Sequence, residues 1–344
     1  MQSKHWLNRL VTGLGLLLLA ALVAGSSSSK LEAADVTLRM ATAEGSKETP
    51  IGETLDLWAK MIEENSDGAI KVNVFYQGEL GGQTEVFDQF VMGDIDLMLT
   101  WPFPTYDKRI SVLYCPYMVL NWEDAKAALR PGGWLNGIIN EVFTDIGLKF
   151  FGPWPEGFNG IATRNEYATT IAGAEEKGIK VRTPPAFPFA DTLQAMGYMT
   201  ADIAWTELYT AIQTGVVDGD AANIIFWDYE YFRDVIDYYT HYKMMFMNGI
   251  LAANLSSWEG LDTAHQKIIM EAAEKVMLKQ FEDGRARDLE YRQKAIDHGI
   301  EFIELTPEEH AEKVKVVREK VWPMMAEKLG TEIMEKIRQN ASTP

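Results

Sequence analysis

The chain has one cysteine among its 344 residues, Cys115, so it cannot form a disulfide within itself. Cys115 lies in the apolar stretch 112–120, where a lone thiol is typical of a small buried hydrophobic side chain rather than of a nucleophile. The fold must therefore be stabilised by the size of its hydrophobic core. With 47% hydrophobic residues, the chain is long enough for two lobes that each have a core.

Basic residues are scarce as well. The sequence has 32 Lys and Arg against 50 Asp and Glu, which gives a formal net charge of -18. Nucleic acids require clustered Lys and Arg side chains for their phosphates, so this composition excludes a nucleic-acid partner. It does not exclude a small anionic ligand, because a single arginine in a partly dry concavity can dominate its surroundings.

Only one long apolar run occurs, at residues 10–24, and it is shorter than the ~20 residues that span a bilayer. Lys4 and Arg9 precede it, and serines and small residues up to Ala34 follow it, which is the arrangement of an export signal. We expect residues 1–34 to be a cleaved signal peptide; an uncleaved membrane anchor is the alternative. Cleavage removes three basic residues and one acidic residue, so the net charge falls from -18 to about -20.

Known catalytic motifs are also missing. The sequence contains no GxSxG, HExxH, CxxC or P-loop pattern. Its histidines are scattered and show no local metal-ligand spacing: His5, His241, His265, His298 and His310. We predict no catalytic residue, no metal and no cofactor, although ligands that are distant in the sequence stay open.

What the sequence does contain is an alternation of strand and helix patterns. Strands are predicted at 36–43, 68–74 and 95–100, with amphipathic helices at 51–64 and 83–92 between them. Strand–helix–strand order predicts the α/β class, with a parallel or mixed sheet.

One spacing occurs twice. Glu85 is followed by seven residues, Gly93, two residues and Asp96; Glu207, Gly215 and Asp218 repeat these intervals. Two lobes of similar build would explain the repeat, and clefts between such lobes are common sites for small molecules. Chance similarity between two ordinary αβ units is the alternative.

The most informative stretch begins with a short strand. Ile179 and Val181 alternate with polar residues, and Pro184 and Pro185 end the pattern because proline has no N–H for a β ladder. Arg182 therefore falls at the carboxyl end of the strand, where open α/β sheets bind their ligands.

A helix and a second strand follow. Trp205 begins a run of apolar residues at helical spacing, and Gly215 suits the C-terminal cap of that helix. A buried strand is predicted at 216–219, and Asn223 comes just after it. We expect Arg182, Trp205 and Asn223 to lie at one rim.

Several of these motifs occur together in one known family. They are GIKVRTPP at 178–185, WTELYTAIQTGVVDGDAAN at 205–223, YQGELGGQTEVFDQFVMGDIDLML at 76–99 and CPYMV at 115–119. On these motifs the protein resembles the solute-binding proteins of tripartite ATP-independent periplasmic (TRAP) transporters, the DctP family. The resemblance covers nearly the whole chain after residue 34.

The resemblance implies a two-lobed α/β periplasmic binding protein, with a ligand cleft between the lobes and a long C-terminal helix, here Thr263–Leu289, that braces both. We expect lobe I to comprise residues 36–157 and 248–289, and lobe II residues 158–247 and 290–340.

It also implies a function. Such a protein captures a small organic anion in the periplasm, closes around it and delivers it to membrane permease subunits. Arg182 matches the family arginine that pairs with the acid group, a role that suits the planar guanidinium fork. A structural salt bridge is the alternative role for Arg182.

The remaining site predictions are aromatic and amide residues. Some members of the family carry a second arginine, and Phe158 stands at its place here, so a ligand held by two arginines is not expected and Phe158 is predicted to line the site instead. Trp101, Trp154 and Trp205 are predicted either to contact the ligand or to pack in the core, and Asn159 to supply hydrogen bonds together with Asn223. Three other tryptophans are assigned to the core: Trp58, Trp258 and Trp322.

One arginine among aromatic rings fits two kinds of ligand. The first is a short carboxylate or a C2 sulfonate such as isethionate, and the second is an aromatic carboxylate that stacks between the rings. Besides a transport receptor, the sequence leaves open a sensor protein that reports its ligand and, as the least favoured function, an exported enzyme that acts on an organic acid.

Overall fold

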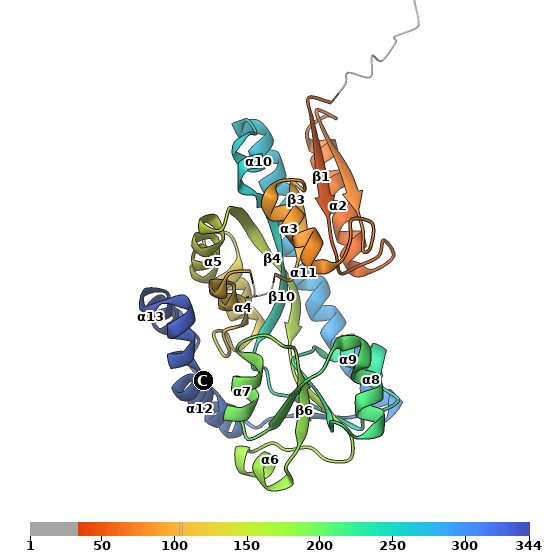
Figure 1. Ribbon diagram of the computed structural model, residues 1–344, viewed down its shortest axis with the longest axis vertical. Helices are drawn as coiled ribbons and strands as arrows, with labels where there is room; N and C mark the ends of the chain where they lie inside the picture. The colour runs from red at the N-terminus through yellow and green to blue at the C-terminus, as the bar shows by residue number, and fades with distance from the viewer. Residues whose placement is uncertain (1–33, 103, 105) are drawn as a thin grey trace, which may run out of the picture. The chain divides into compact units, whose positions relative to one another are not determined.

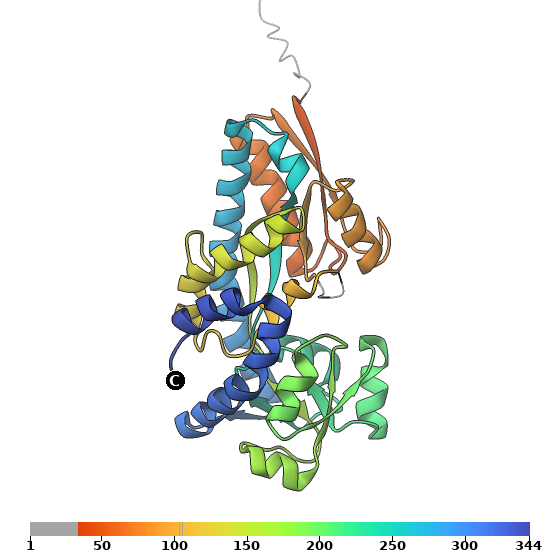
Figure 2. The same ribbon diagram turned by 60° about the vertical axis from the view of Figure 1, so that its left-hand side comes forward.

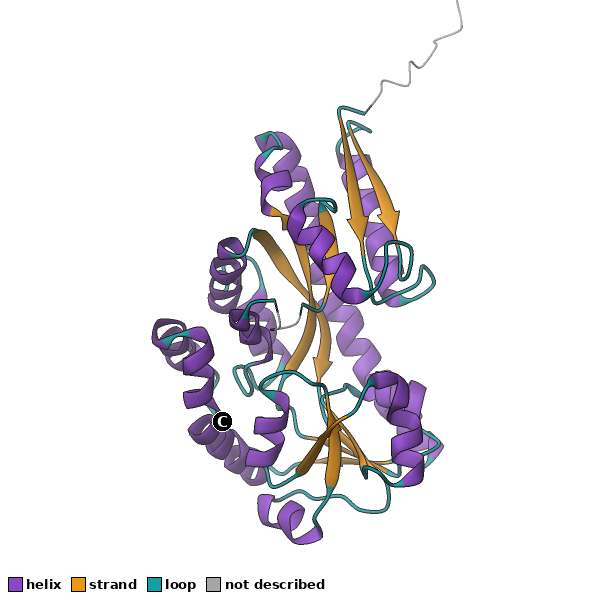
Figure 3. Ribbon diagram, in the orientation of Figure 1, coloured by secondary structure: helices purple, strands orange, loops and turns teal. Residues whose placement is uncertain are grey.

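The computed structural model describes residues 34–102, 104 and 106–344, and Val36–Pro344 form one compact unit. The predicted signal peptide lies outside the described residues, apart from Ala34. The compact unit is of the predicted α/β class and contains two β-sheets (Figures 1 and 3). None of the helices in the described residues combines the length and apolar character that crossing a membrane requires.

The first sheet has five strands in the order β2-β1-β3-β10-β4. β1 (Val36–Ala41) pairs in parallel with β2 (Ile70–Phe75) and with β3 (Leu97–Thr100). β10 (Phe246–Asn254) lies antiparallel between β3 and β4 (Leu148–Phe158). A strand from late in the chain therefore joins the first sheet.

The second sheet has six strands in the order β11-β9-β5-β8-β6-β7. Their bounds are Ile161–Thr163 for β5, Lys180–Thr183 for β6, Met199–Asp202 for β7, Gly219–Ala221 for β8, Tyr238–His241 for β9 and Glu301–Glu304 for β11. β6 is central to the site because it pairs in parallel with both β7 and β8.

Shorter helices connect these strands. They are α2 (Pro50–Asn65), α3 (Gln83–Met92), the 3-10 helix η1 (Lys108–Tyr114), α4 (Trp122–Leu129), α5 (Trp134–Asp145), α6 (Ile171–Lys177), α7 (Phe189–Ala195), α8 (Trp205–Thr214), α9 (Ile225–Phe232) and α10 (Leu255–Glu259). The sequence patterns predict the bounds of α3 and α8 well, because each ends at a glycine whose left-handed backbone can cap a helix.

The long helix α11 (Thr263–His298) contacts elements of both sheets, among them β4 of the first and β11 of the second (Figure 2). It approaches β4 closely at Gly284, where a side-chain carbon would come within 2.9 Å of the Pro155 carbonyl oxygen. The prediction that this helix ends at Leu289 is wrong. It continues until Gly299, whose φ of 104° provides the cap. The predicted lobe boundaries stay a prediction.

The C-terminal segment forms two helices, α12 (Pro307–Leu329) and α13 (Thr331–Asn340). The chain turns at Gly330, which has a φ of 89°. α12 begins with a capping box: the Thr306 side chain accepts from the Glu309 N–H at 3.2 Å, and the Glu309 side chain accepts from the Thr306 N–H at 2.9 Å.

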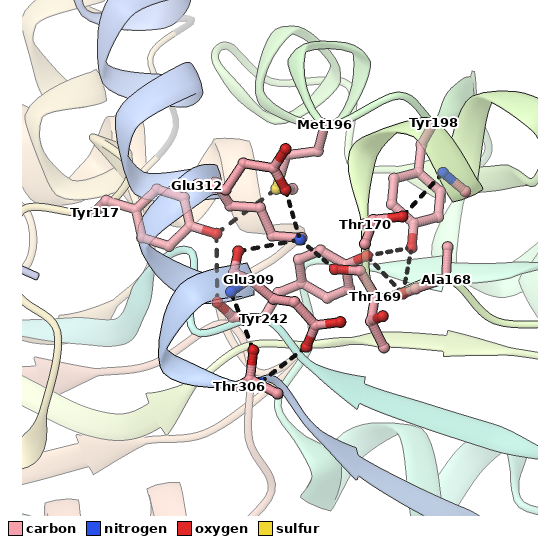
Figure 4. A network of polar contacts seen from close by, with 12 residues as sticks. Tyr117, Ala168, Thr169, Thr170, Met196, Tyr198, Tyr242, Thr306, Glu309 and Glu312 are labelled. Atoms are coloured by element: carbon pink, nitrogen blue, oxygen red, sulfur yellow. Dashed lines mark hydrogen bonds and ion pairs between the residues drawn. The ribbon is translucent and has the colours of Figure 1, made fainter.

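A buried lysine anchors α12. Lys313 is fully buried, and its ammonium group donates to the carbonyl oxygens of Thr169 and of Glu309. Close by, the Tyr242 hydroxyl donates to the Ala168 carbonyl oxygen at 2.7 Å and lies 2.7 Å from the Tyr198 hydroxyl (Figure 4). These bonds join α12 to the loop that precedes α6, and burial lowers the pKa of Lys313.

The main hydrophobic core contains residues from both sheets. Trp58 and Trp322 are buried in it and Trp258 packs against it, as predicted. Cys115 is buried too, and burial raises the pKa of its thiol, so its predicted role as a small hydrophobic side chain is confirmed.

The repeated spacing has a structural meaning. Asp96 follows α3, its N–H donates to the Arg39 carbonyl oxygen of β1, and its carboxylate accepts from the Arg39 N–H at 2.7 Å. Asp218 follows α8 and makes the same two bonds with Lys180 of β6, the second at 2.9 Å. The two units therefore use one device to connect the end of a helix to a strand.

Candidate functional site

The arrangement of β6 and β8 positions the predicted arginine. In the parallel ladder Arg182 pairs with Asp220, so these two side chains start from neighbouring backbone positions. The sequence pattern predicts this second strand at 216–219, but β8 begins only at Gly219. The preceding residues are used by the cap of α8 and by the bonds between Asp218 and Lys180.

Arg182 is an almost fully buried member of an ion pair. Its Nη1 lies 3.3 Å from Oδ1 of Asp220, and the two side chains are 7% and 0% exposed. Its Nε donates to the Ile203 carbonyl oxygen at 2.9 Å. The salt bridge that is the alternative role of this arginine is thus present. Nη2 has no hydrogen-bond partner among the described residues, so two N–H donors are left for another acceptor.

Asn223 joins the same cluster. Its side-chain amide donates to Asp220 and lies 3.5 Å from the carboxyl of Asp228, while the Tyr239 hydroxyl donates to the Asn223 backbone carbonyl oxygen at 3.1 Å. Burial raises the pKa of Asp220 to about 6. Burial, and then the charge of Asp220, raise the pKa of Asp228. Two buried carboxyl groups therefore compete for one arginine.

Trp205, the first residue of α8, covers the arginine. The Arg182 guanidinium carbon lies 5.8 Å from the centre of the indole ring, within the range of a cation–π interaction. The ring also packs edge-on against Tyr231 and Phe232 of α9, at 5.3 and 5.1 Å. The structure thus brings together three of the predicted residues, Arg182, Trp205 and Asn223.

A second polar cluster surrounds Glu156 of β4, which is 6% exposed. One carboxylate oxygen accepts from the indole N–H of Trp101 at 3.0 Å, and the other accepts from the indole N–H of Trp227 at 2.9 Å. Trp101 follows β3, whereas Trp227 lies in α9, so Glu156 joins residues that are distant in the sequence. Burial raises the pKa of this carboxyl group.

The two clusters are connected through α9. The Tyr231 ring, which touches Trp205, lies 6.0 Å from the ring of Trp227. Glu156 and Trp227 were not predicted as site residues. The signals were a lone carboxylate in the aromatic and proline-rich segment 152–159 and a tryptophan at the start of the tyrosine-rich segment 227–242.

Glu44, in the loop after β1, completes the second cluster. Its Oε1 accepts from the Thr100 hydroxyl at 2.9 Å, from the Gln83 side-chain amide at 2.9 Å and from the Trp101 backbone N–H at 3.4 Å. The sequence patterns predict only a polar loop here.

The predicted site residues Trp154, Phe158 and Asn159 are all buried. Trp154 is buried, donates to the Thr54 hydroxyl at 2.9 Å and meets the edge of Trp101 at 5.5 Å between ring centres. Phe158 packs against Phe246. Asn159 is fully buried and accepts from the Met245 N–H at 2.9 Å.

None of the side-chain contacts of Trp154, Phe158 or Asn159 in the described residues is with Arg182, Trp205 or Asn223. Phe158 instead lines a pocket of about 230 Å³ between α4, α11 and the segment after β9. The described residues include no group of three or more His, Cys, Asp or Glu side chains placed to hold a metal ion.

Comparisons with known proteins show similarity to bacterial solute-binding proteins. Residues 40–328 match the family model described as "Bacterial extracellular solute-binding protein, family 7" (DctP). Among curated proteins, the ectoine-binding periplasmic protein TeaA of Halomonas elongata is 26% identical over 284 residues, which cover 78% of this chain and 74% of that protein.

Solved structures resemble the fold. A TRAP periplasmic solute-binding protein of Ochrobactrum anthropi, whose C-terminus is bound in its ligand-binding pocket, has a TM-score of 0.81 at 22% identity and covers 90% of this chain and 95% of its own. A second, of Desulfovibrio salexigens with bound orotic acid, has a TM-score of 0.76 at 21% identity and covers 88% of this chain and 98% of its own.

Proposed function

This chain belongs to the bacterial extracellular solute-binding proteins of family 7, and we propose that it captures a small organic acid in the periplasm by placing the acid group on Arg182. It then delivers the acid to the membrane permease subunits of a TRAP transporter. Residues 1–34 serve as the signal peptide for export. The predicted lobes close around the ligand because the ligand binds the closed form better than the open one.

The observation that carries this proposal is the unused side of the Arg182 guanidinium. Two of its nitrogens are held by Ile203 and Asp220, which fixes the plane of the fork, while Nη2 keeps its donors. A ligand carboxylate or sulfonate that binds Nη2 and shares Nη1 makes charge-assisted hydrogen bonds to a guanidinium that is already oriented.

Trp205 and Asn223 have supporting roles. The indole ring covers the guanidinium and limits access of water, which strengthens the attraction between the arginine and an acid group. Asn223, held by Asp220, reads a hydroxyl or keto oxygen of the ligand. Trp101, whose indole N–H donates to Glu156 in the second cluster, is the other tryptophan that we expect to contact the ligand. The support for Trp154, Phe158 and Asn159 is weaker because each is buried among residues of the core.

The relatives widen the range of acids to be tested. One of them is named for ectoine, and one solved structure holds orotic acid. The finer proposal from the sequence is a short carboxylate or a C2 sulfonate such as isethionate, with an aromatic carboxylate as the alternative.

The test is a ligand screen on protein purified from the periplasm of cells that express the full chain. Carboxylates, sulfonates and aromatic acids are compared by thermal shift, and the affinities of those that bind are measured by calorimetry. We expect at least one acid to bind, and Arg182→Gln to weaken it at least a hundredfold. Arg338→Gln, which removes a charge from an exposed position on α13, is the matched control. Equal affinity of the Arg182 variant and the wild type would refute the proposal.

A further inference from the structure

The charges of the site do not balance. The two clusters contain four carboxyl groups, those of Asp220, Asp228, Glu44 and Glu156. Against them stand two arginines: Arg182, which pairs with Asp220, and Arg287, whose charge acts on Glu156. An acid that binds Arg182 adds another negative charge to surroundings that are already acidic. A ligand that carries negative charge alone is therefore disfavoured by most of the groups near it.

Within the described part of the chain, neither Glu156 nor Glu44 forms an ion pair, although the charge of Arg287 acts on Glu156 from farther away and lowers its pKa. Among the described residues, no Lys, Arg or His nitrogen lies within 4.0 Å of either carboxylate, and the groups that donate to them are neutral indole, amide and hydroxyl groups. A buried carboxylate without a directly paired cation is costly, and burial raises the pKa of Glu156 by more than the charge of Arg287 lowers it.

The geometry of Glu156 agrees with an ionised carboxylate. Each of its two oxygens accepts one indole N–H, at 3.0 and 2.9 Å, and an ionised carboxylate can accept about four hydrogen bonds. Two acceptor positions are therefore left for another donor. Trp101 lies between the two glutamates, since its indole donates to Glu156 and its backbone N–H donates to Glu44.

The aromatic rings around Glu156 also suit a positive charge. The guanidinium of Arg287, on α11, lies 5.9 Å from the ring centre of Trp154 and 5.6 Å from that of Phe226. The Phe226 ring in turn touches Trp227. One cation is thus already held by rings next to the indoles that bind Glu156, in keeping with the attraction between cations and aromatic faces.

We propose that Glu156, together with Glu44, forms the cation-recognising end of the ligand site, so that the solute is an organic acid which also carries a positively charged nitrogen. The acid group binds Arg182, and the ammonium or quaternary nitrogen binds Glu156 between the indoles of Trp101 and Trp227. Amino carboxylates, betaines and aminosulfonates belong to this class. The inference rests on the proposed function, because it takes Arg182 as the partner of the acid group.

The test uses pairs of acids that have the same shape but differ in one charge. They are glycine betaine with 3,3-dimethylbutyrate, 4-aminobutyrate with pentanoate, and taurine with isethionate. Calorimetry on the wild-type protein from the periplasm should show that the nitrogen-bearing member binds at least tenfold more tightly in the pair that fits the site.

Glu156→Gln should reduce this ratio at least tenfold, and Arg182→Gln should weaken both members of the pair. Glu207→Gln is the matched control, because it removes one negative charge from an exposed position on α8 and should leave the ratio unchanged. Glu44→Gln, on the other side of Trp101, is the second variant if Glu156→Gln melts at a much lower temperature than the wild type.

The outcomes separate the two proposals. If uncharged partners or dicarboxylates bind best, or if both glutamate variants leave the ratio unchanged, this inference is overturned while the binding of an organic acid through Arg182 stands. If no acid of any class binds, or if Arg182→Gln binds as well as the wild type, the proposed function itself fails.

Discussion

The ion pair between Arg182 and Asp220 allows the proposed role of the arginine to be tested against a purely structural one. Three variants are needed: Arg182→Gln, Asp220→Asn and the two changes combined. In the free protein the two side chains neutralise each other, and both are buried. In the complex, the acid group of the ligand competes with Asp220 for the same guanidinium.

Both single variants should lower stability. Breaking a buried ion pair by removing one partner costs about 3–5 kcal/mol, because the other charge is left without compensation. After Arg182→Gln, Asp220 can relieve that cost by taking up a proton, since burial already raises its pKa to about 6. A carboxyl whose pKa is raised on folding loses stability as the pH rises above its unfolded value of about 3.9. The loss in Arg182→Gln should therefore be larger at pH 8 than at pH 5.

Asp220→Asn should differ from Arg182→Gln in the pH dependence of its stability and in its affinity for the ligand. The guanidinium stays charged at every accessible pH, so the loss of stability should vary little between pH 5 and pH 8. Affinity should rise, because a carboxylate about 5 Å from the ligand's acid group repels it by roughly 3 kcal/mol at an effective dielectric constant of 20. Even a third of that energy is more than a fivefold gain in affinity.

The assay combines urea unfolding at pH 5 and pH 8 with calorimetry of the best ligand from the screen. We expect Arg182→Gln to abolish measurable binding, Asp220→Asn to bind more tightly than the wild type, and the double variant to be more stable than the sum of the single changes predicts. If both single variants lose affinity equally, or if neither does, Arg182 is a structural residue and the ligand binds elsewhere.

Two further outcomes can be checked with single variants. Trp205→Ala should weaken ligand binding about tenfold in calorimetry, because the ring beside Arg182 is lost, without changing the preference for anions; unchanged affinity would remove Trp205 from the site. His310 is half-buried near the charges of Lys243 and Lys313, and its partial burial, followed by these charges, lowers its pKa to about 4. Urea unfolding should therefore show stability falling as the pH drops from 6.5 to 4, and less so in His310→Gln. An equal pH slope in that variant would contradict this.

Local signals in the sequence were sufficient for much of the fold. The helix at 83–92 and the start of α8 at Trp205 were predicted correctly because caps and apolar spacing are local properties. The resemblance to TRAP solute-binding proteins is confirmed by the family model and by the solved structures, and with it the prediction of a solute receptor rather than an enzyme.

Errors arose where the deciding contact is not local. The predicted helix stops at Leu289, yet ten residues later Gly299 supplies the cap that ends the helix. The strand predicted at 216–219 was shifted because Asp218 bonds to Lys180, which lies 38 positions earlier. The residues next to Leu289 do not show that the cap lies at Gly299, and the apolar residues at 216 and 217 do not show that Asp218 bonds to Lys180.

The same limit applies to the site. The position of Arg182 near the end of β6 could be predicted, because Pro184 and Pro185 end the strand pattern just after it; its role in ligand binding stays a prediction that rests on the family resemblance. Glu156 and Asp220 could not, since the chain has 50 acidic residues and most patterns of Asp and Glu indicate a solvated surface. Burial distinguishes these two carboxylates from most of the other acidic residues, and burial depends on the packing of distant elements.

The internal repeat shows how the two clusters are related. Trp101 is the fifth residue after Asp96, and Asn223 is the fifth residue after Asp218, so the two occupy equivalent positions beyond equivalent strands. Asp220 lies two residues after the repeated aspartate in the second unit, where the first unit has an apolar residue. The same backbone arrangement therefore places the indole of Trp101 beside Glu156 in the first unit. In the second unit it places the side chains of Asn223 and Asp220 beside Arg182. A ligand with an acid group and a cationic nitrogen matches this difference. Its nitrogen would lie at Glu156, beside Trp101, and its acid group at Arg182, beside Asn223.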